Sequence, residues 1–237
     1  MFILLTIISF FTATLSALTG MAGGIALLSI MTIFLPLSIS IPLHGIVQLF
    51  SNSVRCFFLR QNIRFDMAIP FYIGLPFGTY ISYELLKYVR GPTFALILII
   101  FLIFYSVLRP KNLPQLKIPK WSFSLLGLFV GSLSLFIGAI GPVIAPFFIR
   151  DDLGKEEIVA TKSFMQMGGH FLKIPAFFAL GFEYGPYFTP LFSMVIMTII
   201  GTKFGVIILK SINEKLFTII YKVILFTAGV KLLFKIL

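Results

Sequence analysis

Four polar residues lie at helical spacing inside an otherwise apolar stretch of this sequence. They are His44, Gln48, Asn52 and Arg55, at successive steps of 4, 4 and 3 residues. Residues three and four apart share one face of an α-helix, so this spacing predicts a single polar stripe. Side chains of these types donate hydrogen bonds or carry positive charge, which is the chemistry that holds an anion.

A second stripe repeats the first at a distance of 118 positions. Lys162, Gln166, His170 and Lys173 again lie at steps of 4, 4 and 3. Polar groups inside a bilayer are costly unless they meet protein partners or water, so each stripe is expected to face the protein interior or an aqueous path. Two simpler roles stay open. The end residues of each stripe could be anchors at the membrane surface, and the glutamines could serve only to join helices.

The composition shows which elements must position these stripes. The chain has 237 residues, of which 59% are hydrophobic and 11% are charged. Apolar runs recur from end to end and are long enough to cross a hydrocarbon core of about 30 Å. They are continuous and do not alternate with polar residues, which argues against a β-barrel. The sequence therefore predicts an all-α polytopic membrane protein, placed as a multi-pass protein in the cell membrane.

The two halves of the chain resemble each other in order. The stretch "SALTGMAGG" at 16–24 corresponds to "SLFIGAIGP" at 134–142, at the same offset of 118 that relates the stripes. The stretches "GTYISYELLK" at 78–87 and "GTKFGVIILK" at 201–210 share Gly-Thr at their start and Leu-Lys at their end. We therefore predict two homologous repeats, a common construction in membrane transport proteins. The predicted organisation is a first repeat at 1–110, a linker at 111–120 and a second repeat at 121–237.

The first segment of each repeat is long and is interrupted by glycine, at "TGMAGG" in one repeat and at "IGAIGP" in the other. Glycine weakens a helix interior, and proline favours the first turn of a new helix. Each of these segments is thus predicted to consist of two half-helices, the second starting near residue 25 or residue 142. Three transmembrane helices come after it in each repeat. The predicted segments are 1–36, 42–60, 67–87 and 92–109, then 121–149, 158–180, 187–210 and 214–236.

The distribution of basic residues separates two topologies. If both glycine-broken segments cross the membrane, the basic residues of the loops divide eight to six between the two sides. If both segments are re-entrant and the repeats are inverted, they divide ten to four, which is a positive-inside pattern. This count favours the inverted arrangement, with residue 115 of the linker in the cytoplasm and both termini outside. The ten are Arg60, Arg64, Arg109, Lys111, Lys117, Lys120, Arg150, Lys155, Lys210 and Lys215, and the four are Lys87, Arg90, Lys231 and Lys235.

The glycine breaks also indicate an anion site. A half-helix that starts inside the membrane points unpaired N–H groups and the positive end of its dipole into the protein, where oxyanions bind. Glycine would let the backbone approach such a ligand closely. The alternative is that the glycines only allow close helix packing. The predicted substrate-binding residues are Thr19, Gly20, Gly23, Gly24, His44, Gln48, Asn52, Gly138, Gly141, Thr161, Lys162, Gln166 and His170.

Within this set we expect Gln48 and Gln166 to face each other across a two-fold relation between the repeats. Their amides would donate hydrogen bonds to the substrate without fixing a charge that traps it. Lys162 and His170 would add positive potential. Leucine at Gly23 is expected to abolish transport while leaving some folded protein in the membrane, and the same is expected at Gly141.

Other classes of function lack their characteristic residues. The net charge of +11 accompanies no soluble basic domain, so nucleic-acid binding is not expected. His44 and His170 belong to no zinc motif, and no catalytic set, cofactor motif or ATP-binding loop is recognised. The single cysteine, Cys56, excludes an internal disulfide and a multi-cysteine metal site. We therefore expect no enzyme, no cofactor and no metal. Residues 1–19 lack a basic n-region and are expected to belong to the mature protein.

Together these blocks resemble a known family. The paired glycine breaks, "HGIVQLFSNSVR" in the first repeat and "ATKSFMQMGGHFLKI" in the second are similar to the sulfite exporter TauE/SafE family, also called the toluene sulfonate uptake permease family. The resemblance covers nearly the whole chain. Where many members have three consecutive glycines, this chain has Ala22-Gly23-Gly24 and Ile140-Gly141-Pro142. The resemblance implies a permease for small, often sulfur-containing anions such as sulfite, sulfonates or sulfoacetate.

The expected function is thus secondary transport of a small anion, and the expected partners are that anion and the lipid bilayer. Two alternatives stay open: an anion channel of the same architecture, and a membrane component of a complex without transport of its own.

Overall fold

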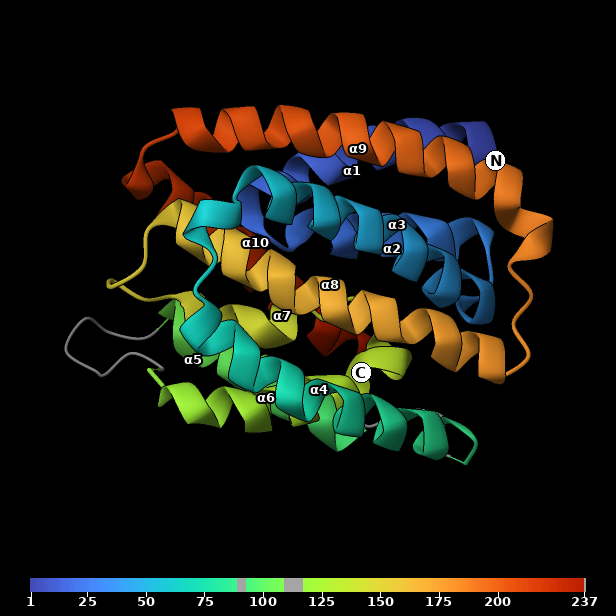
Figure 1. The fold of residues 1–237 in the computed structure, drawn as a ribbon, viewed down its shortest axis with the longest axis horizontal. Coiled ribbons are helices and arrows are strands. Elements are labelled where there is room, and N and C mark those ends of the chain that lie inside the picture. Colours follow the sequence, from blue (N-terminus) through green and yellow to red (C-terminus); the bar gives the residue numbers. More distant parts are fainter. Residues whose placement is uncertain (89–92, 109–116, 237) are drawn as a thin grey trace.

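The structure is a computed structural model that describes residues 1–88, 93–108 and 117–236. Every regular element in these ranges is a helix, as predicted (Figure 1). In the first half the helices are α1 (Phe2–Thr19), α2 (Ala22–Phe34), α3 (Leu37–Phe58), η1 (Arg60–Asn62), α4 (Phe65–Leu86) and α5 (Thr93–Leu108). In the second half they are η2 (Lys120–Ser122), α6 (Phe123–Ile137), α7 (Gly141–Ile144), η3 (Ala145–Phe148), α8 (Lys155–Ala179), η4 (Gly185–Tyr187), α9 (Phe188–Ser211) and α10 (Glu214–Ile236).

Both long first segments are interrupted at glycine, as the sequence predicts. Gly20 ends α1 with a φ of 70°, and Gly138 ends α6 with a φ of 69°. Both φ angles lie in the left-handed region, which glycine enters because it has no Cβ atom, although ψ differs, at 9° for Gly20 and −58° for Gly138. The two glycines are 118 positions apart, which is also the offset between the stripes. The chain is therefore broken at corresponding places in its two halves.

After the first break, α2 folds back along α1. A Cβ atom on Gly23 would lie 1.6 Å from the carbonyl oxygen of Thr12, so the two helix backbones are in direct contact. Thr19 Oγ1 accepts a hydrogen bond from the N–H of Ala22 at 3.1 Å and so satisfies a free donor at the start of α2. The two helices form a hairpin, and the N-terminus and the start of α3 lie toward the same end of the molecule (Figure 1).

The helix after the second break is much shorter than expected. A half-helix was predicted from near residue 142, but α7 spans only four residues and continues as the 3-10 turn η3. Pro146 has no N–H to donate to the carbonyl of Pro142, so the α-helical hydrogen-bond ladder ends there. The first half has no proline between Ala22 and Phe34, and α2 accordingly runs for 13 residues.

Close glycine contacts hold two pairs of helices together. A Cβ atom on Gly78 of α4 would lie 2.1 Å from the carbonyl oxygen of Leu128 on α6. One on Gly201 of α9 would lie 2.2 Å from that of Phe10 on α1. Such contacts are common between membrane helices, where small residues let backbones approach. The pairs α4–α6 and α1–α9 lie on either side of α3 and α8, which pack against each other (Figure 1).

The other helix boundaries lie within about five residues of those predicted. The largest difference is at α3, which starts at Leu37 rather than at 42 because Pro36 fits the position before the first turn. The division into two repeats with a linker stays a prediction. Linker residues 111–116 and the basic residues Arg90 and Arg109 lie outside the described residues.

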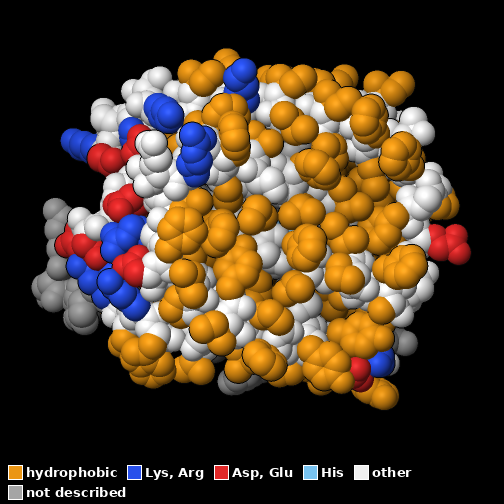
Figure 2. Space-filling view, in the orientation of Figure 1, with side chains coloured by type: hydrophobic (Ala, Val, Ile, Leu, Met, Phe, Trp, Pro, Cys, Tyr) orange, Lys and Arg blue, Asp and Glu red, His pale blue; other side chains and the backbone are white. Residues whose placement is uncertain are grey.

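The surface is that of a membrane protein. Within the described ranges, three helical stretches are long and apolar enough to cross a membrane by length and composition: Phe2–Thr19, Lys120–Ile137 and Gly185–Ser211. The helices α3 and α8 are not among them, since their polar stripes make them less apolar. Figure 2 shows a broad apolar surface, with most of its charged side chains gathered toward one end. Apolar surface of this extent indicates contact with lipid.

Candidate functional site

The two polar stripes lie on α3 and α8, which are neighbours in the middle of the molecule. All eight side chains are buried, and none is more than 4% exposed. His44, Arg55, Lys162 and Lys173, the ends of the stripes, are fully buried. The alternative that they are anchors at the membrane surface is therefore wrong. The stripes face the protein interior, as predicted.

Three donors from the stripes converge on the C-terminal end of α1. The last carbonyls of a helix lack donors within the helix and carry the negative end of its dipole. Basic and amide groups placed there are stabilised by these carbonyls, and Arg55 shares the Ser16 carbonyl with the backbone N–H of Gly20. The hydrogen bonds run from Arg55 Nη1 to Ser16 O at 2.8 Å, from Lys162 Nζ to Thr19 O at 3.4 Å, and from Gln166 Nε2 to Gly20 O at 2.7 Å.

The carbonyls at the second break accept fewer hydrogen bonds from the stripes than those at the first. Lys173 Nζ donates to the carbonyl oxygen of Gly138 at the end of α6. Lys162 Nζ also donates to the hydroxyl of Tyr221 at 2.9 Å, and this hydroxyl donates to the carbonyl of Ala145 at 3.0 Å. Lys162 thus connects both breaks through Tyr221 of α10. Tyr221 is not among the predicted site residues, because nothing in its local sequence distinguishes it from other tyrosines in apolar helices.

The region around the stripes is rich in basic side chains. Arg55, Lys162 and Lys173 are fully buried, and no aspartate or glutamate in the described part of the chain is buried with them. Their hydrogen-bond acceptors are carbonyl, amide and hydroxyl oxygens, which carry only partial charge. Buried cations are stable when a full negative charge compensates them, so this region is suited to an anion. No cluster of three metal-ligating side chains is found among the described residues.

Each glutamine amide lies beside a glycine of its own half of the chain. A Cβ atom on Gly24 would be 3.2 Å from Gln48 Oε1, and one on Gly141 would be 3.1 Å from Gln166 Oε1. Glycine at position 24 therefore leaves room for an amide, and glycine at position 141 leaves room first for Met21, whose Cβ would be 2.8 Å away, and then for the amide of Gln166. The side chain of Gln48 is 3% exposed and makes no hydrogen bond within the described residues, so its two N–H donors are free for a ligand.

The other break glycines have separate structural reasons. Gly20 and Gly138 hold the left-handed turns. Gly23 lies against the backbone of Thr12, so the packing alternative explains this glycine. A leucine at Gly23 would force α2 away from α1. The expectation that this variant stays folded is revised accordingly.

Three further candidates already have protein partners. Asn52 Oδ1 accepts a hydrogen bond from Arg55 Nη2 at 2.7 Å. Thr19 Oγ1 caps α2, and Thr161 Oγ1 accepts the backbone N–H of Arg64 at 3.0 Å, just before α4. These side chains orient Arg55, α2 and the start of α4. They contribute to the shape of the site more directly than to ligand contact.

The structure brings the two histidines together. The ring centroids of His44 and His170 are 5.7 Å apart, with the ring planes at 72°. His44 Nε2 donates to the carbonyl of Gly24 at 2.8 Å. Both Nδ1 atoms are buried without a hydrogen-bond partner in the described residues. The sequence offset pairs His44 with Lys162 and His170 with Asn52. The histidines meet because α3 and α8 run in opposite directions (Figure 1).

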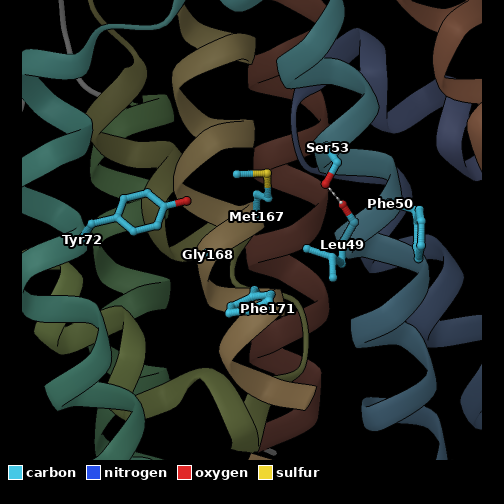
Figure 3. Close-up of a pocket in the computed structure, with 7 residues that line it drawn as sticks. All are labelled: Leu49, Phe50, Ser53, Tyr72, Met167, Gly168 and Phe171. Atoms are coloured by element: carbon cyan, nitrogen blue, oxygen red, sulfur yellow. Dashed lines mark hydrogen bonds between the residues drawn. The ribbon is translucent and has the colours of Figure 1, made fainter. Parts of the chain in front are cut away.

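A groove of about 390 Å³ lies between α3, α4 and α8 (Figure 3). Tyr72 borders it, and its hydroxyl donates to the carbonyl of Phe164 at 2.6 Å. A Cβ atom on Gly168 would be 2.4 Å from the Tyr72 ring, so the ring rests on the α8 backbone. The walls are mainly apolar. The groove therefore flanks the polar stripes without being part of the charged region.

The acidic residues near the second break lie at the surface in ion pairs. Arg150 is 2.6 Å from Asp152, and this contact lowers the pKa of the Asp152 carboxyl to about 2. Lys117 pairs with Asp151 and lowers the pKa of that carboxyl as well. These carboxylates already have basic partners outside the bundle, and they do not compensate the buried bases.

Comparison with known proteins places the chain in one family. No curated protein and no solved structure matches it. The family model described as "Sulfite exporter TauE/SafE" matches residues 5–232, a range that includes both stripes and both glycine breaks. This match confirms the resemblance drawn from the sequence blocks. The chain belongs to the sulfite exporter TauE/SafE family of membrane transporters.

Proposed function

We propose that this protein is a secondary transporter for a small anion, of the class of sulfur-containing oxyanions and organosulfonates such as sulfite or sulfoacetate. The observation that carries the proposal is the buried set Arg55, Lys162 and Lys173, which has no buried carboxylate partner among the described residues. The charges argue for an anion, and the family argues for sulfur. The proposal assigns no catalytic step and no cofactor.

The proposed anion lies between α3 and α8 at the level of the glutamines. Because these helices are antiparallel and His44 lies beside His170, Gln48 and Gln166 fall at the same level along the pair. The free amide of Gln48 donates to the anion, and Lys162 adds charge from its position between the breaks. The N-terminal end of α2 contributes its dipole. The four-residue α7 contributes much less.

We further propose that the chain is an inverted repeat in the cell membrane, with re-entrant first segments. Two matched features support this arrangement. Gly20 and Gly138 are left-handed at an offset of 118. Gly78 contacts the oxygen of Leu128 as Gly201 contacts that of Phe10, so the same contact recurs with the halves exchanged. In this proposal the linker is cytoplasmic and both termini are outside.

Cysteine labelling tests the topology. In a Cys56→Ser background, a cysteine at Lys120 represents the linker end of the molecule, and a cysteine at Glu183 represents the turn between α8 and α9. A membrane-impermeant maleimide added to intact cells should label position 183 and not position 120. A C-terminal tag should be accessible from outside as well. A cytoplasmic C-terminus together with a cytoplasmic position 120 would rule out the inverted repeat and favour eight full membrane crossings.

Transport by the purified protein tests the function. In liposomes that contain only this chain, labelled sulfite or sulfoacetate should enter, and unlabelled anion inside should accelerate that entry. A channel would not show such counterflow. A non-transporting component of a complex would show no entry at all. Calorimetric binding of sulfite, sulfate, thiosulfate, sulfonates and carboxylates would then rank the substrates.

Matched lysine variants connect the transport to the site. Lys173→Met removes a fully buried amine of α8, and Lys203→Met removes an exposed amine of α9. The first should lower anion affinity by tenfold or more, roughly the 1.4 kcal/mol of one lost charge contact. The second should bind like the parent protein. Equal anion affinity of both variants would show that the buried amine of Lys173 does not contribute to substrate binding.

A further inference from the structure

The histidine pair has a feature that anion binding alone does not require. His44 donates through Nε2 to the carbonyl of Gly24, so its Nδ1 is an unprotonated acceptor. That Nδ1 is buried without a partner, and so is the Nδ1 of His170, 5.7 Å away between ring centroids. Buried acceptors are normally paired. Two unpartnered imidazole nitrogens at one place indicate a site that an added proton can occupy.

The groups around the pair explain why a proton would not stay there by itself. Lys173 of α8 and Arg55 of α3 are the positive groups that act on the histidines, and Lys162 lies two turns away on α8. Tyr72 of α4 packs against Gly168. Gly168 lies on the opposite face of α8 from His170, so Tyr72 does not face the histidine pair. Helices α1, α2, α6 and α7 bear no titratable side chain. The pair therefore faces positive charge and no carboxylate among the described residues.

We propose that His44 and His170 form the proton site that couples transport, so that one proton and one anion are carried together. This inference rests on the proposed function. Without an anion, Arg55 and Lys173 repel an added proton. A bound anion compensates these charges, and a proton from water can then form an N–H bond at an orphaned Nδ1. On the other side of the membrane the anion leaves, and the proton returns to water.

This linkage works in both directions. If the anion raises the affinity of the pair for a proton, the proton raises the affinity of the site for the anion by the same factor. A second proton on the neighbouring ring would meet a like charge, which limits the pair to one. Anion and proton therefore enter as a pair, and a proton gradient can drive accumulation of the anion.

The first test uses the parent protein and needs no variant. Sulfoacetate is the probe, because its carboxylate and sulfonate stay ionised near neutral pH and it brings no proton of its own. Calorimetric titrations in two buffers of different ionisation enthalpy, at about pH 7.5, give the protons taken up per anion bound. The expected value is about one, with apparent affinity falling about tenfold for each unit of rising pH. Binding without proton uptake would overturn the proposal.

The second test measures coupling. In liposomes with an internal pH dye and a clamped membrane potential, an inward sulfoacetate gradient should acidify the lumen. The double variant His44→Gln/His170→Gln should not acidify it, because glutamine preserves hydrogen-bond donors but binds no proton. Ser163→Ala is the matched control: its hydroxyl is also buried and unpartnered on α8 but does not titrate, and acidification should persist.

The outcomes separate the two proposals. Sulfoacetate movement by the parent protein without proton movement would overturn the coupling role and leave the transporter intact. Unchanged proton movement in the double variant would also overturn it. Absence of both binding and movement for sulfoacetate and sulfite would overturn the proposed function, and the coupling role would fall with it.

Discussion

The two glycine breaks share a left-handed glycine and differ in the helix that comes after it. After Gly20 the chain forms the 13-residue α2, whereas after Gly138 it forms the four-residue α7 and a 3-10 turn. The carbonyls at the end of α1 accept hydrogen bonds from the side chains of Arg55, Lys162 and Gln166. The carbonyl at the end of α6 accepts one from Lys173 alone. Related sequences have thus produced two breaks whose end carbonyls accept different numbers of side-chain donors.

This difference shows how a repeat can become asymmetric. The first break is fixed by backbone contact and by several buried donors. The second break has Pro146 in place of a continuous helix, and it ends in a charged loop at 150–154. Most residues from 140 to 148 are nevertheless buried in the core, so packing holds the second break more than hydrogen bonds do. We therefore expect the second break to lose less stability than the first when a buried donor to its carbonyls is removed.

The largest expected effect comes from Gly23→Ala. The new Cβ atom would lie 1.6 Å from the Thr12 carbonyl oxygen, so α2 cannot stay against α1. We expect a loss of stability of about 3 kcal/mol or more, measured by thermal unfolding in detergent.

Gly24→Ala is the matched control. The new atom there meets the flexible side chain of Gln48 at 3.2 Å, and both substitutions gain the same helix propensity of about 1 kcal/mol. It should unfold near the temperature of the parent. Equal stability of both variants would show that α1 and α2 are not packed as described.

The next largest effect is the difference in stability between variants of the buried bases at the two breaks, Arg55 and Lys173. Arg55→Met should destabilise the protein by about 2 kcal/mol more than Lys173→Met, because Arg55 makes hydrogen bonds to Ser16, Ser51 and Asn52, whereas Lys173 makes one to Gly138. Chemical denaturation of the two variants measures the difference. A larger loss of stability for Lys173→Met than for Arg55→Met would contradict the stronger hydrogen bonding inferred for the first break.

The glutamines should separate binding from stability. Gln48→Ala and Gln166→Ala should each weaken anion binding by about 1–3 kcal/mol, roughly five- to 150-fold. Only Gln166→Ala should also lower stability, by about 1 kcal/mol, because it loses the bond to Gly20. Gln166→Glu should bind more weakly still through charge repulsion.

Calorimetry and thermal unfolding, run on the same preparations, check these values. If both alanine variants bind like the parent while stability falls, the glutamines only join helices and the anion site lies elsewhere.

The smallest effect concerns the loop after the second break. Contact with Arg150 lowers the pKa of Asp152 to about 2, so this pair adds stability above the ordinary carboxyl pKa of about 4 and loses it as the pH falls toward 2. The side chain of Asp152 is 44% exposed, which keeps the effect below about 1 kcal/mol.

Unfolding temperatures of the parent and Asp152→Asn, compared between about pH 5 and pH 2, should differ at the upper end of this range and converge at the lower end. The first break ends at Leu35 and Pro36 without charged residues, so no such pH dependence is expected from that turn. A difference that persists at the lowest pH would assign the effect to another interaction of Asp152.

Much of the fold is set by local patterns. The apolar runs predicted the helices to within about five residues, since burial and lipid contact dominate in such segments. The breaks at Gly20 and Gly138 were visible because glycine is needed for a left-handed turn. The predicted length of α7 was wrong: Pro142 marks the start of a helix, but Pro146 ends it within one turn.

The sequence by itself determined that residues at steps of 4, 4 and 3 share one helix face, because helical geometry is local. It also determined that no acid accompanies Arg55, Lys162 and Lys173 on the stripes, whereas their burial in the interior came from the structure. Only the tertiary structure decided which atoms meet. The meeting of His44 with His170 depends on antiparallel helices from different halves of the chain, and the link from Lys162 to Tyr221 depends on the place of α10. Such contacts join residues far apart in sequence, where no local spacing records them.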